Sequence, residues 1–141
     1  MPSRVLVVDD DPFLRRILSF LLAGAGHEVE CVEDGEQAWD LLCRAAGDPP
    51  DLVISDLMMP GISGLDLVRR MRARPGLDIP VLILTARGQR IDEAEARLCG
   101  ASAFMTKPFR SQELLDRISR LLAQSNAGDG EDEDCATGTD C

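Results

Sequence analysis

The chain has 141 residues, of which 45% are hydrophobic and 28% charged, a composition that suits one globular domain with a short appendage. No run approaches the roughly 18 apolar residues that a membrane span requires, and the apolar segment near the N-terminus is too short for a signal peptide, so we expect a cytoplasmic protein with no membrane contact. The formal net charge of −10 argues against nucleic acid as a partner, because phosphate contacts need clustered Lys and Arg.

The first third of the chain predicts a strand, a helix and a second strand. Residues 5–8 form a continuous apolar strand, and residues 28–32 alternate polar with apolar as an edge strand does. Between them, Asp11 and Pro12 begin a helix over residues 12–24, with an acid at the N-cap and proline in the first turn. Arg15 and Arg16 fall on the predicted polar side of this helix. Its predicted buried side comprises Leu14, Ile17, Leu18 and Leu21.

The middle of the chain repeats this alternation. Asp34 and Gln37 resemble a capping box before a helix that closes near Pro49. An apolar strand follows over residues 52–54, and another over residues 81–84. Between these strands, Ser63 and Asp66 can cap a third helix. The inward side of that helix is predicted to be Leu65, Val68 and Met71.

The last third predicts a weaker, charged helix that ends at Gly100, a short strand over residues 103–105, and a final helix. Beyond about Gln124 the composition is too polar to bury a core, and residues 125–141 contain six acids and no base. We therefore predict a domain over residues 1–124 and a disordered acidic tail over residues 125–141. The apolar stripe of the final helix is Leu114, Leu115, Ile118, Leu121 and Leu122.

Strands separated by helices of this length predict parallel crossovers and a sheet covered on both faces. The first, third and fourth strands are apolar throughout and belong in the middle, whereas the second and fifth are short or alternating and belong at the edges. A doubly wound α/β fold satisfies this condition. We predict a flavodoxin-like (βα)5 architecture with five parallel strands in the order 2-1-3-4-5.

In such a sheet, ligands bind beyond the carboxyl ends of the strands. The side chains expected there are Asp9, Asp10, Asp11, Asp56, Thr85 and Lys107. Capping explains Asp11, but it does not explain two further acids that face a third. At ~4 Å and an effective dielectric constant of ~20, each pair of carboxylates repels by about 4 kcal/mol. A hard divalent cation that prefers oxygen ligands, such as Mg²⁺, relieves this repulsion.

The same cluster predicts phosphoryl transfer. Asp56 is the expected nucleophile, because a carboxylate can carry a phosphoryl group as a mixed anhydride. The metal and the Lys107 ammonium would stabilise charge on the phosphoryl oxygens, and Thr85 offers a hydroxyl.

Four segments of the chain resemble the four signatures of bacterial two-component response-regulator receiver domains. The resemblance spans roughly residues 3–123, essentially the whole predicted domain. Each signature alone has little specificity, but all four in this order make a strong match. The segments are Val7-Val8-Asp9-Asp10-Asp11-Pro12, Ser55-Asp56-Leu57-Met58-Met59-Pro60-Gly61, Leu84-Thr85-Ala86 and Thr106-Lys107-Pro108-Phe109.

The resemblance implies specific roles for the clustered residues. Asp56 would be the phosphoacceptor, modified to 4-aspartylphosphate. Asp9, Asp10 and Asp56, with the backbone carbonyl of Met58, would bind Mg²⁺, or Mn²⁺ in its place. Thr85 and Lys107 would bind the phosphoryl group, and the Lys107–Pro108 bond would be cis.

The resemblance also implies how the signal is passed on. Thr85 and Phe104 would act as switch residues, and Gly61 and Gly64 would shape the loop after the phosphorylated strand. The face made by the fourth helix, fifth strand and fifth helix would bind a downstream protein. Met58 and Arg87 occupy the two variable positions that tune self-dephosphorylation, and beyond such self-phosphorylation and self-dephosphorylation we expect no enzymatic activity.

Partners follow from the same resemblance. The phosphodonor would be a sensor histidine kinase or a phosphotransfer protein, and the output would be protein–protein contact. The segment 100–104 lacks the acids found at this point in dimerising relatives, so we expect a monomer or weak dimer. Only about 17 polar residues follow the last helix, too few for a DNA-binding module, so we expect a stand-alone regulator or a phosphorelay intermediate.

Three other functions would each place different demands on these residues. A haloacid-dehalogenase-like phosphatase needs a second Asp two residues after the nucleophile, where Met58 stands. A flavin-mononucleotide binder needs a phosphate-cradling loop after the first strand, where three aspartates would repel phosphate. A degenerate receiver that acts only as a scaffold stays open, although no key residue is missing.

The five cysteines are expected to be free thiols. Cys31, Cys43 and Cys99 fall within predicted elements and are expected to be buried. Cys135 and Cys141 lie in the acidic tail, where a metal or redox role is a weaker interpretation.

Overall fold

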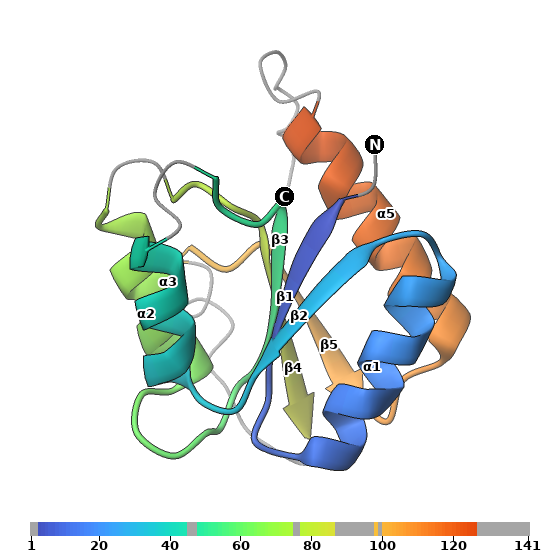
Figure 1. Ribbon diagram of the computed structural model, residues 1–141, viewed down its shortest axis with the longest axis horizontal. Helices are drawn as coiled ribbons and strands as arrows, with labels where there is room; N and C mark the ends of the chain where they lie inside the picture. The colour runs from blue at the N-terminus through green and yellow to red at the C-terminus, as the bar shows by residue number, and fades with distance from the viewer. Residues whose placement is uncertain (1–2, 45–47, 75–76, 87–97, 99, 127–141) are drawn as a thin grey trace.

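The computed structural model describes residues 3–44, 48–74, 77–86, 98 and 100–126. Within these residues, strands and helices alternate from residue 4 to residue 86, and a further strand and helix cover residues 103–126 (Figure 1). The strands are β1 (Arg4–Val8), β2 (Glu28–Val32), β3 (Leu52–Asp56), β4 (Val81–Ala86) and β5 (Ala103–Lys107). The helices are α1 (Pro12–Gly24), α2 (Gly35–Arg44), α3 (Gly64–Arg72) and α5 (Ser111–Asn126). No helix in this described part is long and apolar enough to cross a bilayer.

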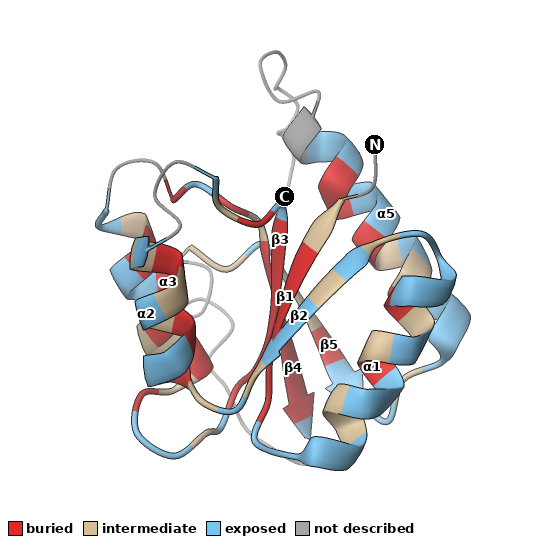
Figure 2. Cartoon of the chain, viewed as in Figure 1, coloured by how far each residue is buried: buried red, intermediate tan, exposed pale blue. Residues whose placement is uncertain are grey.

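The strands form one parallel sheet in the order β2-β1-β3-β4-β5, which confirms the predicted topology. β1, β3 and most of β4 are buried, whereas β2 and β5 at the edges are partly exposed (Figure 2). One row of paired residues crosses the whole sheet, from Cys31 through Val7, Ile54 and Leu82 to Ala103. This register places the carboxyl ends of all five strands at one edge.

Helices cover both faces of the sheet (Figure 1). On one face, α1 and α5 bury Leu18, Leu22, Leu114 and Ile118 against the odd-numbered positions of β1. On the other face, α2 and α3 bury Leu42, Leu67 and Met71 against the even-numbered positions of β1. Successive strand residues point to opposite faces, so each central strand must be apolar throughout. The continuous apolar runs in the sequence reflect this double burial.

The helix starts agree closely with the predicted caps. The Asp11 side chain accepts from the Phe13 backbone N–H at 2.9 Å, and Ser63 with Asp66 forms a reciprocal capping box. Asp34 caps α2 by accepting from the Gln37 N–H, but the Gln37 side chain bonds to the N–H of residue 33 instead of residue 34. The local chemistry of these residues therefore sets where the helices begin.

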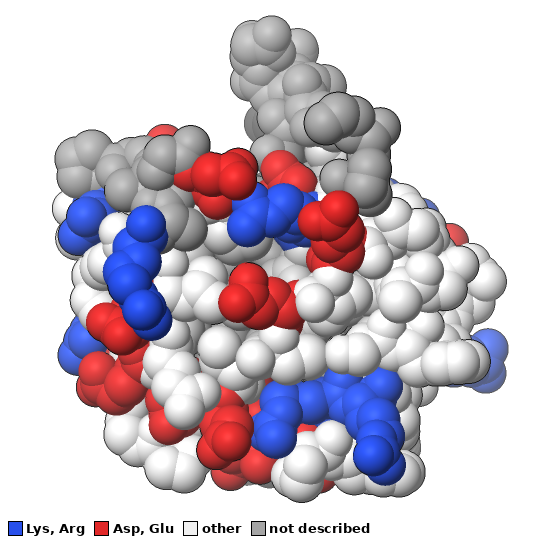
Figure 3. All heavy atoms as spheres, viewed as in Figure 1, with Lys and Arg blue, Asp and Glu red and all other residues white. Residues whose placement is uncertain are grey.

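The predicted buried side of α1 is wrong at Ile17, which is 36% exposed. The residues that pack fully are Leu18 and Leu22. At about 100° per residue, Ile17 lies well around the helix from them, on the same side as Phe13 and Phe20, which are 69% and 80% exposed. The visible flank over the upper part of α1 is uncharged, and basic side chains cover the lower end of the helix (Figure 3).

Two of the cysteines are also less buried than predicted. Cys31 is free but exposed, because it lies on the edge strand β2, where its Sγ is 3.1 Å from the Ser19 hydroxyl. Cys43 is free and half-buried beside Arg74. Cys99, Cys135, Cys141 and most of the predicted fourth helix lie outside the described residues, and α5 ends at Asn126, two residues beyond the predicted domain boundary.

The glycine at the start of α3 lets the helix approach the end of β3. A Cβ added at Gly64 would lie 2.5 Å from the Asp56 carbonyl oxygen and 3.2 Å from the Ser55 Oγ. The Gly64 N–H donates to the Leu57 carbonyl at 2.9 Å. The close approach therefore needs a residue without a side chain at this position.

Gly64→Ala should destabilise the fold by about 1–3 kcal/mol, because the added methyl group forces backbone at the end of β3 to move. Gly24→Ala is the matched control: nothing lies within 4 Å of its Cβ position at the end of α1, and alanine favours helix by up to ~1 kcal/mol. Urea unfolding of the three proteins measures the difference. Equal stability of Gly64→Ala and the unmodified chain would contradict the close packing.

Candidate metal centre at the carboxyl edge of the sheet

Two neighbouring strands bring three acids together. β1 pairs with β3 so that Val8 lies opposite Ser55. The residues that follow these two in the chain are both acids, Asp9 and Asp56. Asp10 comes directly after Asp9. One carboxylate oxygen from each of the three lies within 4.8 Å of the others. The predicted juxtaposition of these acids is therefore present in the structure.

Asp9 is almost completely buried, and its polar groups are held from several directions. Its N–H donates to the Val32 carbonyl at 3.2 Å, its Oδ1 accepts from the Asp11 N–H at 2.9 Å, and its carbonyl accepts from Arg15 Nη1 at 2.7 Å. Its Oδ2 is buried and has no hydrogen-bond partner. Buried polar atoms are normally satisfied, so this oxygen fits a ligand to a cation.

Burial raises the pKa of Asp9 above its ordinary value of 3.8. The hydrogen bond from the Asp11 N–H opposes this rise, as does the Lys107 ammonium, while the negative charges of Asp56 and Asp10 add to it. Removal from water and like charge both disfavour the carboxylate form. A bound cation would oppose both effects, because a nearby positive charge stabilises the carboxylate form of Asp9.

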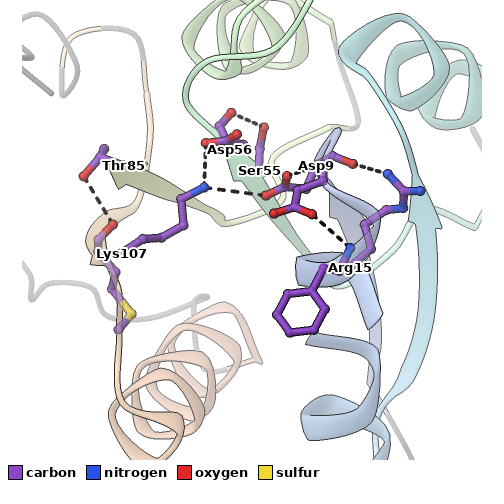
Figure 4. Close-up of polar contacts among 9 residues, drawn as sticks. Asp9, Arg15, Ser55, Asp56, Thr85 and Lys107 are labelled. Atoms are coloured by element: carbon purple, nitrogen blue, oxygen red, sulfur yellow. Dashed lines mark hydrogen bonds and ion pairs between the residues drawn. The ribbon is translucent and has the colours of Figure 1, made fainter. Parts of the chain in front are cut away.

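Lys107 places its ammonium between two of the acids (Figure 4). Its Nζ lies 3.3 Å from Asp56 Oδ1 and 3.9 Å from Asp9 Oδ2. The residue ends β5, and the Lys107–Pro108 bond is cis as expected. One ammonium among three carboxylates leaves a formal charge of −2, which a divalent cation would neutralise.

The donor set suits a hard cation. Carboxylate oxygens are the ligands that Mg²⁺ prefers, and Mg²⁺ typically keeps one or two such ligands with several waters. Asp10 is exposed at the rim and could reach such an ion from the solvent side. Met58, whose backbone carbonyl was predicted as a ligand, lies two residues beyond Asp56, and its side chain is exposed.

The predicted switch residues lie on β4 and β5. Thr85 is buried, and its hydroxyl donates to the Met105 carbonyl at 3.4 Å. In Figure 4 this hydroxyl is directed toward β5 and away from Asp56. Phe104 is half-buried and packs against the core cluster on the α2 and α3 side. Among the described residues, no hydrogen bond joins either of them to the acids.

Sequence reasoning missed Arg15, which was assigned to the polar, outward side of its helix. The structure places Arg15 half-buried, with its guanidinium on the Asp9 carbonyl. Side chains of a helix point back toward its N-terminus. A long cationic side chain one turn after the Asp11 cap is therefore a signal that could have indicated the contact.

Comparison with known proteins gives consistent results. A family model described as response regulator receiver domain matches residues 5–119. Response regulator MprA of Mycolicibacterium vanbaalenii is 41% identical over 136 residues, covering 96% of this chain and 57% of that protein. The chain therefore spans about half the length of the curated relatives it matches.

Solved structures agree. Chemotaxis response regulator CheY4 of Vibrio cholerae is 32% identical, with a TM-score of 0.78 over 86% of this chain and 99% of that one. The receiver domain of sensor histidine kinase PA1611 from Pseudomonas aeruginosa is 27% identical, with a TM-score of 0.77 over 87% and 99%. That domain was solved with a magnesium ion coordinated in its active-site cleft.

Asp9→Asn should raise the melting temperature by a few degrees in EDTA at pH 7. A raised pKa means that the native state binds more protons than the unfolded chain between pH 3.8 and the native pKa, so stability falls as pH rises through that window. Asparagine removes the buried charge and keeps an acceptor for the Asp11 N–H. Thermal unfolding measures the change, with Asp78→Asn on an exposed loop as control.

Adding Mg²⁺ to the same measurement should stabilise the proteins that keep Asp9 more than Asp9→Asn. A ligand that binds only the native state stabilises it, so Mg²⁺ should raise the melting temperature of the unmodified chain and of Asp78→Asn more than that of Asp9→Asn. A lower melting temperature for Asp9→Asn in EDTA, or an equal gain from Mg²⁺ in all three proteins, would contradict this account of the cluster.

Proposed function

The chain belongs to the response regulator receiver domain family, and on that premise we propose that it is a phosphorylation-dependent signalling switch with Asp56 as phosphoacceptor. The observation that carries the proposal is the position of the Asp56 carboxylate. It ends β3 with the Lys107 ammonium at 3.3 Å and the Asp9 and Asp10 oxygens within 4.8 Å. This arrangement combines a nucleophile, a cation for phosphoryl oxygens and a metal-binding pair of acids.

The proposed step is a phosphoryl transfer from a phosphohistidine of a sensor kinase or phosphotransfer protein. An Asp56 carboxylate oxygen attacks phosphorus, the P–N bond to the donor imidazole breaks, and the imidazole leaves with the bonding electron pair. The product is the mixed anhydride on Asp56. Lys107 is placed to bind a phosphoryl oxygen as charge shifts during transfer.

Mg²⁺ would be held by the carboxylates of Asp9, Asp10 and Asp56 and by the backbone carbonyl of Met58, and Mn²⁺ suits the same oxygen ligands. When bound, the ion neutralises negative charge on the phosphoryl oxygens and on the acids around them. The buried Asp9 Oδ2, which accepts no hydrogen bond, supports this assignment. So does the magnesium ion in the related PA1611 receiver domain.

The output would pass through β4 and β5. Thr85 would exchange its bond to the Met105 carbonyl for one to a phosphoryl oxygen, and Phe104 would turn inward behind it. This is a two-state element that a local charge event can bias. The face that includes β5 and α5 would then bind a downstream protein, while hydrolysis of the anhydride, tuned by Met58 and Arg87, resets the switch. Arg87 lies outside the described residues.

Incubation of the purified chain with Mg²⁺ and acetyl phosphate tests the phosphoacceptor. Intact mass spectrometry should show one phosphoryl adduct that depends on Mg²⁺ and is lost in Asp56→Asn. Asp78→Asn, an exposed acid outside the cluster, is the matched control and should retain the adduct.

Each other outcome has a defined meaning. An adduct that persists in Asp56→Asn, or forms equally well in EDTA, would overturn the assignment of Asp56 or of the metal. No adduct on the unmodified chain would favour a scaffold that works without phosphorylation.

Lys107→Ala should slow phosphorylation from acetyl phosphate by at least ~10-fold and should uncouple the remaining phosphorylation from β4 and β5. Amide NMR shifts of residues 103–107 before and after phosphorylation measure this coupling. Arg110→Ala removes an exposed cation three residues away and should leave both rate and shifts unchanged. Normal phosphorylation-dependent shifts in Lys107→Ala would contradict the role of Lys107 in transmission.

A further inference from the structure

The Arg15 guanidinium holds the peptide group that joins the first two acids of the cluster. From the first turn of α1, its Nη1 donates to the Asp9 carbonyl at 2.7 Å, and Figure 4 shows the side chain reaching back toward the end of β1. Hydrogen bonds from a charged donor are stronger than neutral ones. Because the peptide group is planar, a fixed Asp9 carbonyl also fixes the amide that leads into Asp10.

Asp10 depends on that peptide for its direction. Its side chain is exposed and makes no hydrogen bond or ion pair to the described residues. Asp9, by contrast, is also anchored by the Val32 carbonyl and the Asp11 N–H. Even so, an Asp10 carboxylate oxygen lies within 4.8 Å of those of Asp9 and Asp56. The backbone therefore presents Asp10 to the cluster.

We propose that Arg15 is a positioning residue for cation binding: its hydrogen bond to the Asp9 carbonyl orients the Asp9–Asp10 peptide so that both carboxylates face one ion. The inference rests on the proposed function, because it takes a divalent cation to bind this cluster. Partners of the groups that hold a metal commonly set its affinity without touching the metal. Arg15 would act in this way through the main chain.

A purely electrostatic effect of Arg15 would change the Mg²⁺ affinity in the opposite direction. A guanidinium near the acids repels a cation by simple electrostatics, so its removal would tighten Mg²⁺ binding. Loss of a positioning hydrogen bond would weaken binding, because Asp10 could then turn away into solvent. The direction of the change in Mg²⁺ affinity separates the two effects.

The test uses Arg15→Met, which keeps the aliphatic part of the side chain and removes its donors. Arg16→Met is the matched control, since Arg16 is the next residue on α1, carries the same charge and is exposed. Titration calorimetry of the full chain with MgCl₂ should show binding weakened about tenfold in Arg15→Met. Arg16→Met should bind Mg²⁺ equally or up to about twofold more tightly at low salt.

Two further measurements sharpen the result. Arg15→Lys should recover affinity to within about threefold of the unmodified chain, because an ammonium can donate to the same carbonyl. With acetyl phosphate, Arg15→Met should need about tenfold more Mg²⁺ for half-maximal phosphorylation, while its rate at saturating Mg²⁺ stays close to that of the unmodified chain. Circular dichroism checks folding, and Arg15→Leu, which also has no donor, replaces Arg15→Met if that variant does not fold.

Unchanged or tighter Mg²⁺ binding in Arg15→Met would overturn the positioning role, as would an Arg15→Lys variant that binds as weakly as Arg15→Met. A rate that stays low at saturating Mg²⁺ would also overturn it, because the defect would then lie in the chemistry. Failure of the unmodified chain to bind Mg²⁺ would instead overturn the proposed function.

Discussion

Three carboxylates and one ammonium share a small volume at the carboxyl edge of the sheet. The acids lie within 4.8 Å of one another, and Lys107 lies 3.3 Å from Asp56 and 3.9 Å from Asp9. Because Asp9 is removed from water and one of its oxygens accepts no hydrogen bond, this balance of charge is incomplete. Polar groups that are buried without partners destabilise a fold, so the rest of the domain must hold the acids in place against their repulsion.

Main-chain packing supplies much of that support. Gly64 lets α3 approach the Asp56 carbonyl, and the Ser55 hydroxyl donates to the same carbonyl at 3.0 Å. Arg15 bonds to the Asp9 carbonyl, and β2 accepts from the Asp9 N–H. These contacts act on backbone positions and leave the carboxylates themselves available.

Periodicity in the sequence predicted the elements well where burial was one-sided or complete. It failed to predict how far some individual side chains reach into the core. Ile17 belongs to an apolar pattern in α1, yet only Leu18 and Leu22 reach the sheet fully. Arg15 belongs to the polar side of the same helix, yet its length carries the guanidinium back to β1. Cys31 lies on β2, which its alternating pattern correctly placed at the edge of the sheet, yet its thiol is exposed and not buried as predicted.

The sequence by itself determined the order of the strands and the identity of the acids at their ends. Strands with both faces buried must be largely apolar, and Asp9, Asp10 and Asp56 stand within two residues of the end of such runs. Only the tertiary structure decided which buried carboxylate oxygen accepts no hydrogen bond, that the Lys107 ammonium lies between two acids, and that the Thr85 hydroxyl bonds to β5 in this state. These features depend on the register between strands far apart in the chain and on side-chain rotamers, which composition and spacing do not encode.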